Sequence, residues 1–268
     1  MLNPKGPIGA EEKSLIVTAA ILMLVVIVPV IIMAIAFAVR YRASNTKARY
    51  MPEWSHSRPI EIGVWVVPLI IVSILGYLAW TRSHSLDPFQ PLASKVRPVT
   101  IQVVSMDWKW LFIYPDEHLA SVNEIAFPVN TPVDFFITSD TVMNSFFIPQ
   151  LGSQVYTMAG MVTQLHLMAS HVGVYRGISA NFSGPGFSGM TFAARAMSAE
   201  GYQQWLRAAR ASPRKLDAEA YAMLRKPSEN NPVEYFSSVE PHLFMTIATE
   251  YMGRTDGTQT AANMSLHK

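Results

Sequence analysis

The sequence predicts a membrane-anchored protein with two N-terminal transmembrane helices, an all-β sandwich domain and a C-terminal helical extension. Three observations lead to this fold class. Two long uncharged runs stand near the N-terminus, short apolar runs separated by turn residues follow them, and helical periodicity marks the C-terminal part. The expected segments are an N-terminal segment with the helical hairpin at 1–96, the β-domain at 97–197, the extension at 198–252 and a flexible tail at 253–268.

The overall composition hides this division. The chain has 268 residues, of which 50% are hydrophobic and 15% charged, with a net charge of +2 and no cysteine. Such a hydrophobic content is near the average of soluble proteins, so its uneven distribution carries the information. The balanced charge gives no case for nucleic-acid binding, which usually shows as a clustered basic face. Without cysteine, this sequence offers no disulfide, thiolate metal site or cysteine nucleophile.

Two uncharged runs, 14–39 and 62–81, are the predicted spans. Each reaches the roughly 20 residues that a helix needs to cross a hydrocarbon core about 30 Å thick. Pro29 and Pro68 are tolerated in spanning helices, where neighbours satisfy the freed backbone groups. Two core helices of a soluble protein are the alternative, but such helices rarely run this long without a charge. The first run also exceeds the apolar stretch of a signal peptide, so we interpret it as a retained span.

The basic residues predict the orientation of the two spans. The connecting loop carries five of them, Arg40, Arg42, Lys47, Arg49 and Arg58. Because basic residues concentrate in cytoplasmic loops, this loop is predicted to be cytoplasmic. Both termini and the β-domain are then expected on the outer, periplasmic side.

Short apolar runs from about residue 97 predict the β-domain. They cover 99–106, 108–114, 133–138, 145–151, 163–169, 173–182 and 190–197. Strands at this spacing are typical of a sandwich or a barrel. Trp108 and Trp110 lie two apart in the second run, so we expect them on one face of a strand.

The extension is predicted to be helical at 199–210, 216–226 and 241–252. Apolar residues recur there at three- and four-residue steps. Pro241 suits the first position of the third helix, since its missing N–H needs no partner there.

Few side chains suggest chemistry by themselves. The seven histidines show no helical metal spacing, and His166 shares strand parity with Gln164, which favours a solvated strand residue. No hydrolase, metalloprotease or nucleotide-binding motif is present in the sequence. Glu61 opens the second span. It is either a first-turn acid favoured by the helix dipole or a proton-collecting carboxylate at the membrane edge, and the residues alone favour the first.

Five longer motifs carry a resemblance to a known family. They are EIGVWVVPLII at 61–71, VVSMDWKW at 103–110, VNEIAFPVNTPV at 122–133, MNSFFIPQLGSQVYTMAG at 143–160 and GVYRGISANFSGPGFSGM at 173–190. With these motifs the chain resembles subunit II of the haem–copper respiratory oxidases, from Asn3 to about Met252. The resemblance implies a cupredoxin-like fold for the β-domain.

In the cytochrome c oxidase branch of this family, the domain holds a dinuclear copper centre. The resemblance places the two histidines, two cysteines, glutamate and methionine of that centre at Asn144, Phe187, Ser179, Ser183, Asn181 and Met190, respectively. Only Met190 keeps the side chain of a ligand. Serine hydroxyls are hard, neutral donors and cannot replace bridging thiolates. The resemblance therefore implies no metal and no other cofactor in this chain.

The loss of these ligands points to the quinol oxidase branch. The forms NSFFIP and SGPGFSGM and the aromatic-rich segment NNPVEYFSSVEPHLF at 230–244 resemble the cytochrome bo type. The resemblance implies a non-catalytic subunit II of a proton-pumping ubiquinol oxidase in a bacterial inner membrane. Haems and copper would belong to subunit I, ubiquinol would be the substrate of the complex, and cytochrome c would not dock. The expected partners are subunit I, other oxidase subunits and membrane lipid.

The resemblance also changes how two residues are interpreted. In the family, a glutamate at the position of Glu61 lies near the mouth of a proton pathway into subunit I, which now favours a role in proton entry. Trp108 stands where the cytochrome c branch passes electrons inward, and without copper we expect only a packing role. Many bacterial members begin with a lipoprotein signal ending in an acylated cysteine. This sequence begins MLNPKGPIG, so either its start lies downstream of the true one or the protein is unacylated.

Two alternatives stay open at this point. One is a cytochrome c oxidase subunit II with a working copper centre, which the missing ligands disfavour. The other is a stand-alone membrane-anchored scaffold protein, which would be extracted without a haem-bearing partner.

Overall fold

The computed structural model describes residues 2–47, 51 and 53–251. The predicted tail at 253–268 lies outside the described residues, as does Met252 at the end of the third predicted helix of the extension. The chain divides into two compact units. One contains the residues up to Glu12 together with those from Pro88 onward, and the other runs from Lys13 to Asp87. The first residues of the chain therefore belong with the β-domain, whereas the sequence pattern groups them with the hairpin.

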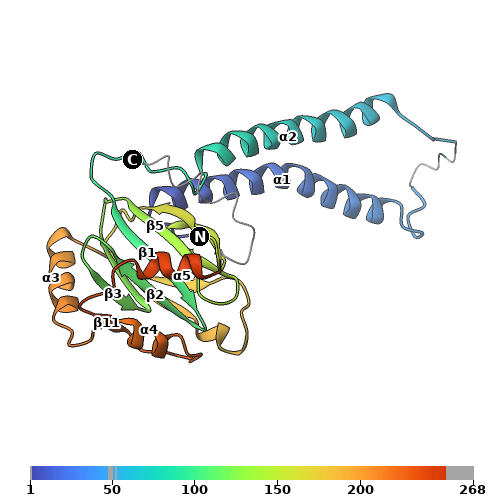
Figure 1. Ribbon diagram of the computed structural model, residues 1–268. Coiled ribbons are helices and arrows are strands. Elements are labelled where there is room, and N and C mark those ends of the chain that lie inside the picture. The colour runs from blue at the N-terminus through green and yellow to red at the C-terminus, as the bar shows by residue number, and fades with distance from the viewer. Residues whose placement is uncertain (1, 48–50, 52, 252–268) are drawn as a thin grey trace. The chain divides into compact units, whose positions relative to one another are not determined.

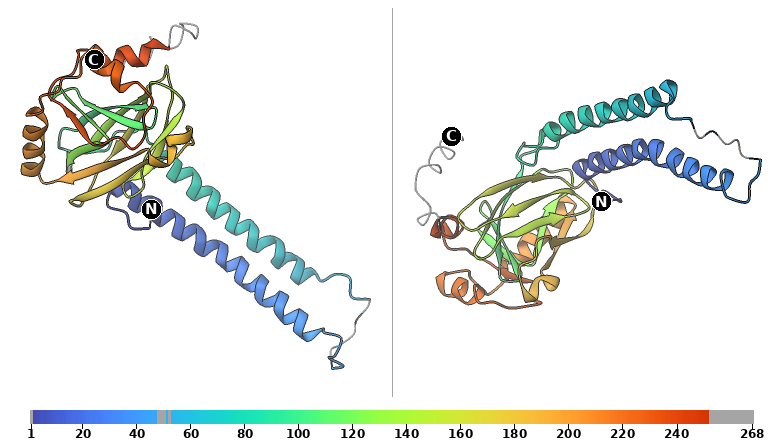
Figure 2. Two further views of the ribbon diagram at one scale, coloured as in Figure 1. Left: turned by 90° about the horizontal axis from the view of Figure 1, so that it is seen from below. Right: turned by 90° about the vertical axis from the view of Figure 1, so that its right-hand side faces the viewer.

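Two long helices form the N-terminal part, α1 at Pro7–Arg40 and α2 at Arg58–Ser85. Both predicted spans lie inside them, and Figure 2 draws each as one continuous helix. Their most apolar windows have mean hydropathies of 3.2 and 2.4, and within the described part of the chain no residue of these windows is buried. Apolar helices of this length that nothing in the chain covers are suited to a lipid bilayer or to the helices of a partner.

The β-domain is a sandwich of two sheets (Figure 1). The six-stranded sheet has the order β11-β3-β2-β1-β5-β8, and the five-stranded sheet has the order β4-β10-β9-β6-β7. Two neighbouring pairs are parallel, β1 with β5 and β4 with β10, and the other pairs are antiparallel.

Most of the predicted runs correspond to strands of the two sheets. The six-stranded sheet contains β1 Val99–Met106, β2 Lys109–Tyr114, β3 Leu119–Val122, β5 Val133–Ser139, β8 Thr163–Leu167 and β11 Glu234–Phe236. The five-stranded sheet contains β4 Glu124–Pro128, β6 Asn144–Ile148, β7 Gly152–Thr157, β9 Gly173–Ser179 and β10 Thr191–Met197, and a 3-10 turn, η1, lies at Pro185–Gly189. The prediction missed β3, β4, β7 and β11. Strands β4 and β11 pair only with strands far along the chain, β10 and β3, whereas β3 and β7 pair with the strands directly before them, β2 and β6.

Three helices belong to the C-terminal extension, α3 at Ala199–Arg210, α4 at Ala218–Leu224 and α5 at Leu243–Glu250. Side-chain caps begin the first two, since Ser198 accepts a hydrogen bond from the Gly201 N–H at 3.1 Å and Asp217 accepts one from Ala220 at 2.9 Å. The expected start of the third helix at Pro241 is corrected. Helix α5 begins two residues later, after His242 with a φ of 63°.

The six-stranded sheet is apolar on both faces. Inside the sandwich, aromatic rings meet across the sheets, with the Trp110 ring centroid 5.5 Å from that of Phe146 and 5.7 Å from that of Phe192. The outer face carries a second hydrophobic cluster in which Val104, Leu111, Val122 and other sheet residues pack against the extension. The extension contributes Leu216, Tyr221, Phe236, Leu243, Phe244 and Ile247 to this cluster. In Figure 1, α5 accordingly lies in front of β1 and β2.

The first residues of the chain are tied to the β-domain by backbone contacts. The Lys5 N–H donates to the Gln150 carbonyl at 2.7 Å, and the Gly9 N–H donates to that of Leu151 at 2.9 Å. A Cβ on Gly6 would lie 2.2 Å from the Met168 carbonyl oxygen, so this approach requires glycine. The carboxylate of Glu12 accepts hydrogen bonds from the N–H and hydroxyl of Ser153 at 2.7 and 3.0 Å. The start of α1 is thus held by the domain that follows it in sequence.

A buried carboxylate joins the extension to both sheets. Glu124 on β4 is 2% exposed and accepts from Arg195 Nε on β10 at 2.5 Å and from Trp205 Nε1 on α3 at 3.1 Å. The hydroxyl of Tyr235 on β11 also donates to this carboxylate. Burial, followed by this hydrogen bond, raises the pKa of Tyr235 to about 12, so the phenol stays a donor at neutral pH.

Replacing this carboxylate is expected to destabilise the domain. Glu124→Ala leaves Arg195, Trp205 and Tyr235 without their shared acceptor, and we expect the free energy of unfolding to fall by about 3 kcal/mol. Denaturant unfolding of the full chain in detergent measures this change. As a control, Arg97→Ala breaks the exposed Arg97–Asp116 pair and should cost less than about 1 kcal/mol. Equal losses in the two variants would contradict a special role for Glu124.

Candidate functional site

The six positions that the resemblance assigned to a copper centre do lie together at one end of the sandwich. We call Asn144, Ser179, Asn181, Ser183, Phe187 and Met190 the loop cluster. Asn144 begins β6 and Ser179 ends β9, while the other four follow in the connection from β9 to β10, with Phe187 on η1. Two loops therefore build the cluster, the β5–β6 loop at 140–143 and the β9–β10 loop at 180–190.

The polar side chains of Asn144, Ser179 and Asn181 in the loop cluster bond to one another and to nearby backbone. The Ser179 hydroxyl donates to Asn144 Oδ1 at 3.0 Å, and Asn144 Nδ2 donates to the Val142 carbonyl at 3.3 Å. Asn181 Nδ2 donates to the Met143 carbonyl at 3.2 Å. These bonds connect the two loops through neutral groups.

The donors of the loop cluster do not fit a pair of copper ions. The Met190 side chain is 1% exposed and belongs to the hydrophobic core, and the Phe187 ring packs edge-on against that of Phe182 with centroids 5.6 Å apart. Hydroxyl and amide oxygens lack the softness that copper needs from thiolate and imidazole ligands. Among the described residues, no group of three or more His, Cys, Asp or Glu side chains gathers where it could hold a metal ion.

The expectation that Trp108 shares a strand face with Trp110 is wrong. Trp108 occupies the tight turn between β1 and β2 with a φ of 62°, while Trp110 is buried in the core. The turn aims the Trp108 indole at the β9–β10 loop, where Nε1 donates to the Ser183 carbonyl at 3.2 Å. A Cβ on Gly186 would lie 2.5 Å from this indole, so the loop backbone rests directly on the ring. Two residues of spacing indicate one face only when both residues stay in the strand.

Glu61 lies in the first turn of α2 and is exposed. Its Oε1 accepts a hydrogen bond from the backbone N–H of Ser57, the N-cap residue, at 3.0 Å. This contact caps the helix, and the position agrees with the interpretation of Glu61 as a first-turn acid.

The expectation that His166 is a solvated strand residue is wrong. His166 is 6% exposed, and its Nδ1 lies 2.7 Å from Asp134 Oδ1, the residue opposite it on β5. Strand alternation predicts on which face a side chain lies, but it does not predict what covers that face. This contact lies between β5 and β8 of the six-stranded sheet, and it does not bring His166 to the loop cluster.

Two charged groups near the loop cluster were missed from the sequence. Lys109 is 1% exposed, and its Nζ donates to the carbonyls of Leu224 and Lys226, each at 2.8 Å, and to the Ser228 hydroxyl at 2.5 Å. Burial lowers the pKa of Lys109, while the charges of Asp107 and Glu234 partly oppose that shift. A single charge within the apolar run WKWLFIY was the available signal, because a buried cation needs dedicated acceptors.

Asp140 is the second of these groups. It is 0% exposed at the end of β5, and Arg225 Nε donates to its Oδ2 at 2.9 Å. Burial raises the pKa of Asp140, and Arg225 opposes that shift. Nothing local in the sequence links positions 140 and 225, so this pair could not have been found there.

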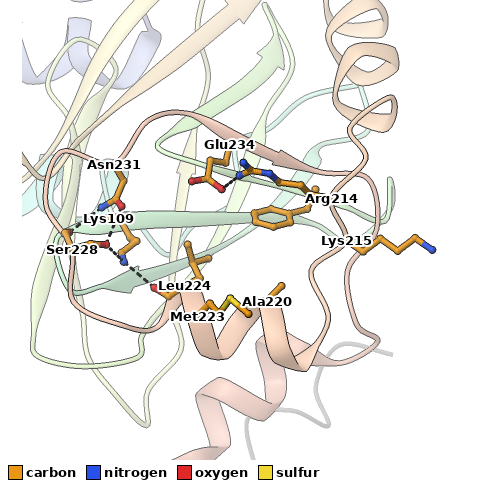
Figure 3. A pocket seen from close by; sticks show the side chains of 10 residues that line it. Lys109, Arg214, Lys215, Ala220, Met223, Leu224, Ser228, Asn231 and Glu234 are labelled. Carbon is orange, nitrogen blue, oxygen red and sulfur yellow. Dashed lines mark hydrogen bonds and ion pairs between the residues drawn. The ribbon is translucent and has the colours of Figure 1, made fainter.

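A cavity of about 420 Å³ opens beside Lys109, between the six-stranded sheet and α4 (Figure 3). Its lining includes Arg214, Glu234, Met223 and Phe236. Arg214 and Glu234 form an ion pair with each other, and the ammonium of Lys109 already has three acceptors. Of the cations that line this cavity, Lys109 and Arg214 are therefore engaged by the protein itself.

Comparison with known families identifies two parts of the chain. The family described as the periplasmic domain of cytochrome c oxidase subunit II matches residues 115–197, and the family described as the COX aromatic-rich motif matches residues 210–254. The matched segments cover most of the sandwich and the extension from the end of α3 onward.

Several curated proteins are similar to the whole chain. Cytochrome bo(3) ubiquinol oxidase subunit 2 of Pseudomonas aeruginosa is 58% identical over 97% of this chain and 79% of the relative. Ubiquinol oxidase subunit 2 of Acetobacter aceti is 51% identical over 94% of the chain and 82% of the relative, and quinol oxidase subunit 2 of Bacillus cereus is 36% identical over 85% and 78%.

Part of the chain is similar to a solved structure. The periplasmic domain of subunit II of cytochrome oxidase from Bradyrhizobium japonicum aligns with a TM-score of 0.40 at 22% identity, covering 44% of this chain and 96% of that domain. The family assignment therefore depends on the sequence relatives.

The contact between Trp108 and Ser183 is expected to be structural and modest. Trp108→Phe removes one hydrogen bond but keeps an aromatic ring beneath the β9–β10 loop, so the free energy of unfolding should fall by about 1 kcal/mol. Denaturant unfolding of the full chain measures this, with the exposed Trp54→Phe as a control that should change nothing. A chain that no longer folds after Trp108→Phe would overturn this expectation.

Proposed function

The chain belongs to the family of ubiquinol oxidase subunits 2, and we propose that it is the non-catalytic subunit II of a proton-pumping complex that oxidises quinol and reduces oxygen to water. Relatives named as this subunit match nearly the whole chain at up to 58% identity. The work of this chain in the complex is assembly, stabilisation and a contribution to proton entry.

The loop cluster is the observation that carries the non-catalytic role. An electron-entry subunit of the cytochrome c branch needs soft copper ligands at these positions. Here Ser179 bonds to Asn144, and Met190 is buried in the core. Electrons from quinol therefore pass to subunit I without crossing this chain, and cytochrome c has no docking role. The same observation disfavours a cytochrome c oxidase subunit II as the alternative.

The protein is anchored in a membrane and carries an external domain. We propose the bacterial inner membrane, with the loop between α1 and α2 in the cytoplasm and the β-domain on the periplasmic side. The basic residues of that loop support this orientation. Both helices expose apolar side chains around their whole circumference, which supports contacts with lipid and with helices of subunit I.

Haems and copper belong to subunit I in this proposal, where they supply the electron-transfer and oxygen chemistry. This chain contributes none of their ligands. A stand-alone scaffold protein would also lack them, and it differs from the proposed subunit only in lacking a haem-bearing partner.

We propose that Glu61 helps to supply protons at the cytoplasmic end of α2. Its carboxylate is exposed and accepts one hydrogen bond from the Ser57 N–H, which leaves the second oxygen open to protons. The capping contact also stabilises the first turn of α2, so a test has to separate the two roles.

Purification from the membrane tests the proposed function directly. Gentle detergent extraction through a tag on this chain should yield a complex with a haem spectrum that oxidises ubiquinol and does not oxidise reduced cytochrome c. Recovery of this chain alone, without haem, would favour a scaffold protein. A complex that prefers reduced cytochrome c and has copper in the β-domain would favour the cytochrome c branch.

Substitutions at Glu61 separate proton supply from helix capping. Glu61→Gln keeps an oxygen acceptor for the Ser57 N–H but cannot carry a proton as a carboxylate does, whereas Glu61→Ala loses both. We expect both variants to assemble and to show a several-fold lower rate of proton uptake and quinol turnover. Glu53→Gln removes another exposed carboxylate of the same loop and serves as the control. Normal proton pumping in Glu61→Gln would exclude the role in proton supply.

A further inference from the structure

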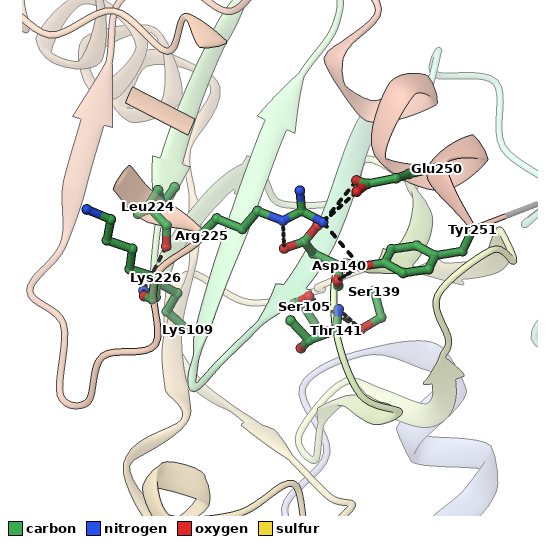
Figure 4. A network of polar contacts seen from close by, with 10 residues as sticks. All are labelled: Ser105, Lys109, Ser139, Asp140, Thr141, Leu224, Arg225, Lys226, Glu250 and Tyr251. Carbon is green, nitrogen blue, oxygen red and sulfur yellow. Dashed lines mark hydrogen bonds and ion pairs between the residues drawn. The ribbon is translucent and has the colours of Figure 1, made fainter. Parts of the chain in front are cut away.

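The segment between α4 and β11 contacts both loops of the loop cluster. Arg225 directly follows α4, and its Nε donates to Asp140 Oδ2 at 2.9 Å, at the start of the β5–β6 loop. The other end of its guanidinium donates to both carboxylate oxygens of Glu250 at 2.9 Å, and the Tyr251 hydroxyl donates to the Asp140 carbonyl at 3.0 Å. Figure 4 shows these side chains converging on Asp140. Charge-assisted hydrogen bonds of this kind are stronger than neutral ones.

Asp140 connects Arg225 to the rest of the β5–β6 loop. Its backbone N–H donates to the Ser105 carbonyl at 2.9 Å, which fixes the loop to the end of β1. The neighbouring Ser139 hydroxyl donates to the Val142 carbonyl at 2.8 Å and accepts from the Thr141 N–H at 3.2 Å. The loop is thus held from Ser139 to Val142, directly before Asn144 of the loop cluster.

The same segment reaches the β9–β10 loop a few residues later. A Cβ on Gly186 would lie 2.7 Å from Glu229 Cγ, and one on Gly189 would lie 2.5 Å from Asn230 Oδ1. The two glycines therefore let Glu229 and Asn230 lie directly on the backbone of η1. Asn230 takes a φ of 52°, a conformation that asparagine tolerates better than most residues.

Lys109 sets the position of both contacts. Its ammonium binds the carbonyls of Leu224 and Lys226, the two residues that flank Arg225, and then the hydroxyl of Ser228. Ser228 in turn donates to Asn231 Oδ1 at 2.9 Å, and the Asn231 carbonyl accepts from Asn123 Nδ2 at 3.0 Å. One buried cation on β2 therefore holds residues 224–228, and the bonds of Ser228 and Asn231 hold the turn with Glu229 and Asn230.

We propose that residues 224–231 form a clamp, positioned by Lys109, that fixes both loops of the loop cluster in one conformation. One arm of the clamp is Arg225 on Asp140, and the other is Glu229 and Asn230 on Gly186 and Gly189. The direct bonds between the two loops are few and neutral, and the loops hold no cysteine or histidine that could link them. The clamp supplies this link from outside. The inference rests on the proposed function in one respect, that these loops bind no copper.

Hydrogen exchange in the purified oxidase tests the clamp. In Lys109→Met, which keeps the length of the apolar stem but removes the three donors, we expect amides of both loops, 140–143 and 180–190, to exchange about tenfold faster or more. Arg214→Met is the matched control, because it breaks an ion pair within the same extension whose arginine is 60% exposed and touches neither loop. Its loop amides should exchange as in the wild type.

Two single-arm variants keep the test decisive if Lys109→Met fails to fold. Tyr251→Phe removes the hydroxyl that bonds to Asp140 and Arg225, and it should speed exchange only in the β5–β6 loop. Glu229→Ala should speed it only in the β9–β10 loop. Unchanged loop exchange in the folded variants, or an equal change in Arg214→Met, would overturn the clamp.

The haem spectrum and the quinol assay judge the proposed function separately. Copper bound at the loop cluster would refute that function whatever the exchange rates are. A quinol-oxidising complex whose loops ignore the substitutions would refute only the clamp.

Discussion

A sheet that is apolar on both faces needs a cover on both faces, because burying apolar surface is the main favourable contribution to folding. The six-stranded sheet meets this condition in two ways. The second sheet covers its inner face, and α4 and α5 with the aromatic residues Tyr221 and Phe244 cover its outer face. The extension is therefore an integral layer of the domain, and its position follows from this need. The clamp on the loop cluster depends on that layer, because residues 224–231 lie within it.

Lys109 is the exception in this apolar arrangement. A cation in a strand whose other side chains are buried would destabilise the fold unless fixed acceptors replaced its water. The carbonyls of Leu224 and Lys226 and the hydroxyl of Ser228 are those acceptors. These acceptors lie at the end of α4 and in the turn that follows it. The three hydrogen bonds that offset the desolvation of the Lys109 ammonium therefore also fix the position of this turn and of the clamp.

The loop cluster lies where the sequence resemblance places the ligands of a copper centre. Several of these positions have a local structural use in this chain. Ser179 and Asn144 bond to each other, Met190 fills the core, and Phe187 packs against Phe182. Trp108 likewise supports the β9–β10 loop through the Ser183 carbonyl. Because these contacts are mutual, restoring a single ligand would leave unpaired polar groups and would not restore a copper centre.

The sequence by itself determined the two spans, since length without charge is a property of a continuous segment. It also determined the bounds of β1 and α3, whose periodicities are local. Only the tertiary structure decided that Trp108 lies in a turn, that His166 pairs with Asp134, and that the extension covers the sheet. It alone joined Lys109 to residues 224–228 and Arg225 to Asp140. These outcomes depend on contacts between residues up to 119 positions apart, whereas a local pattern indicates which face a side chain occupies but not what will cover it.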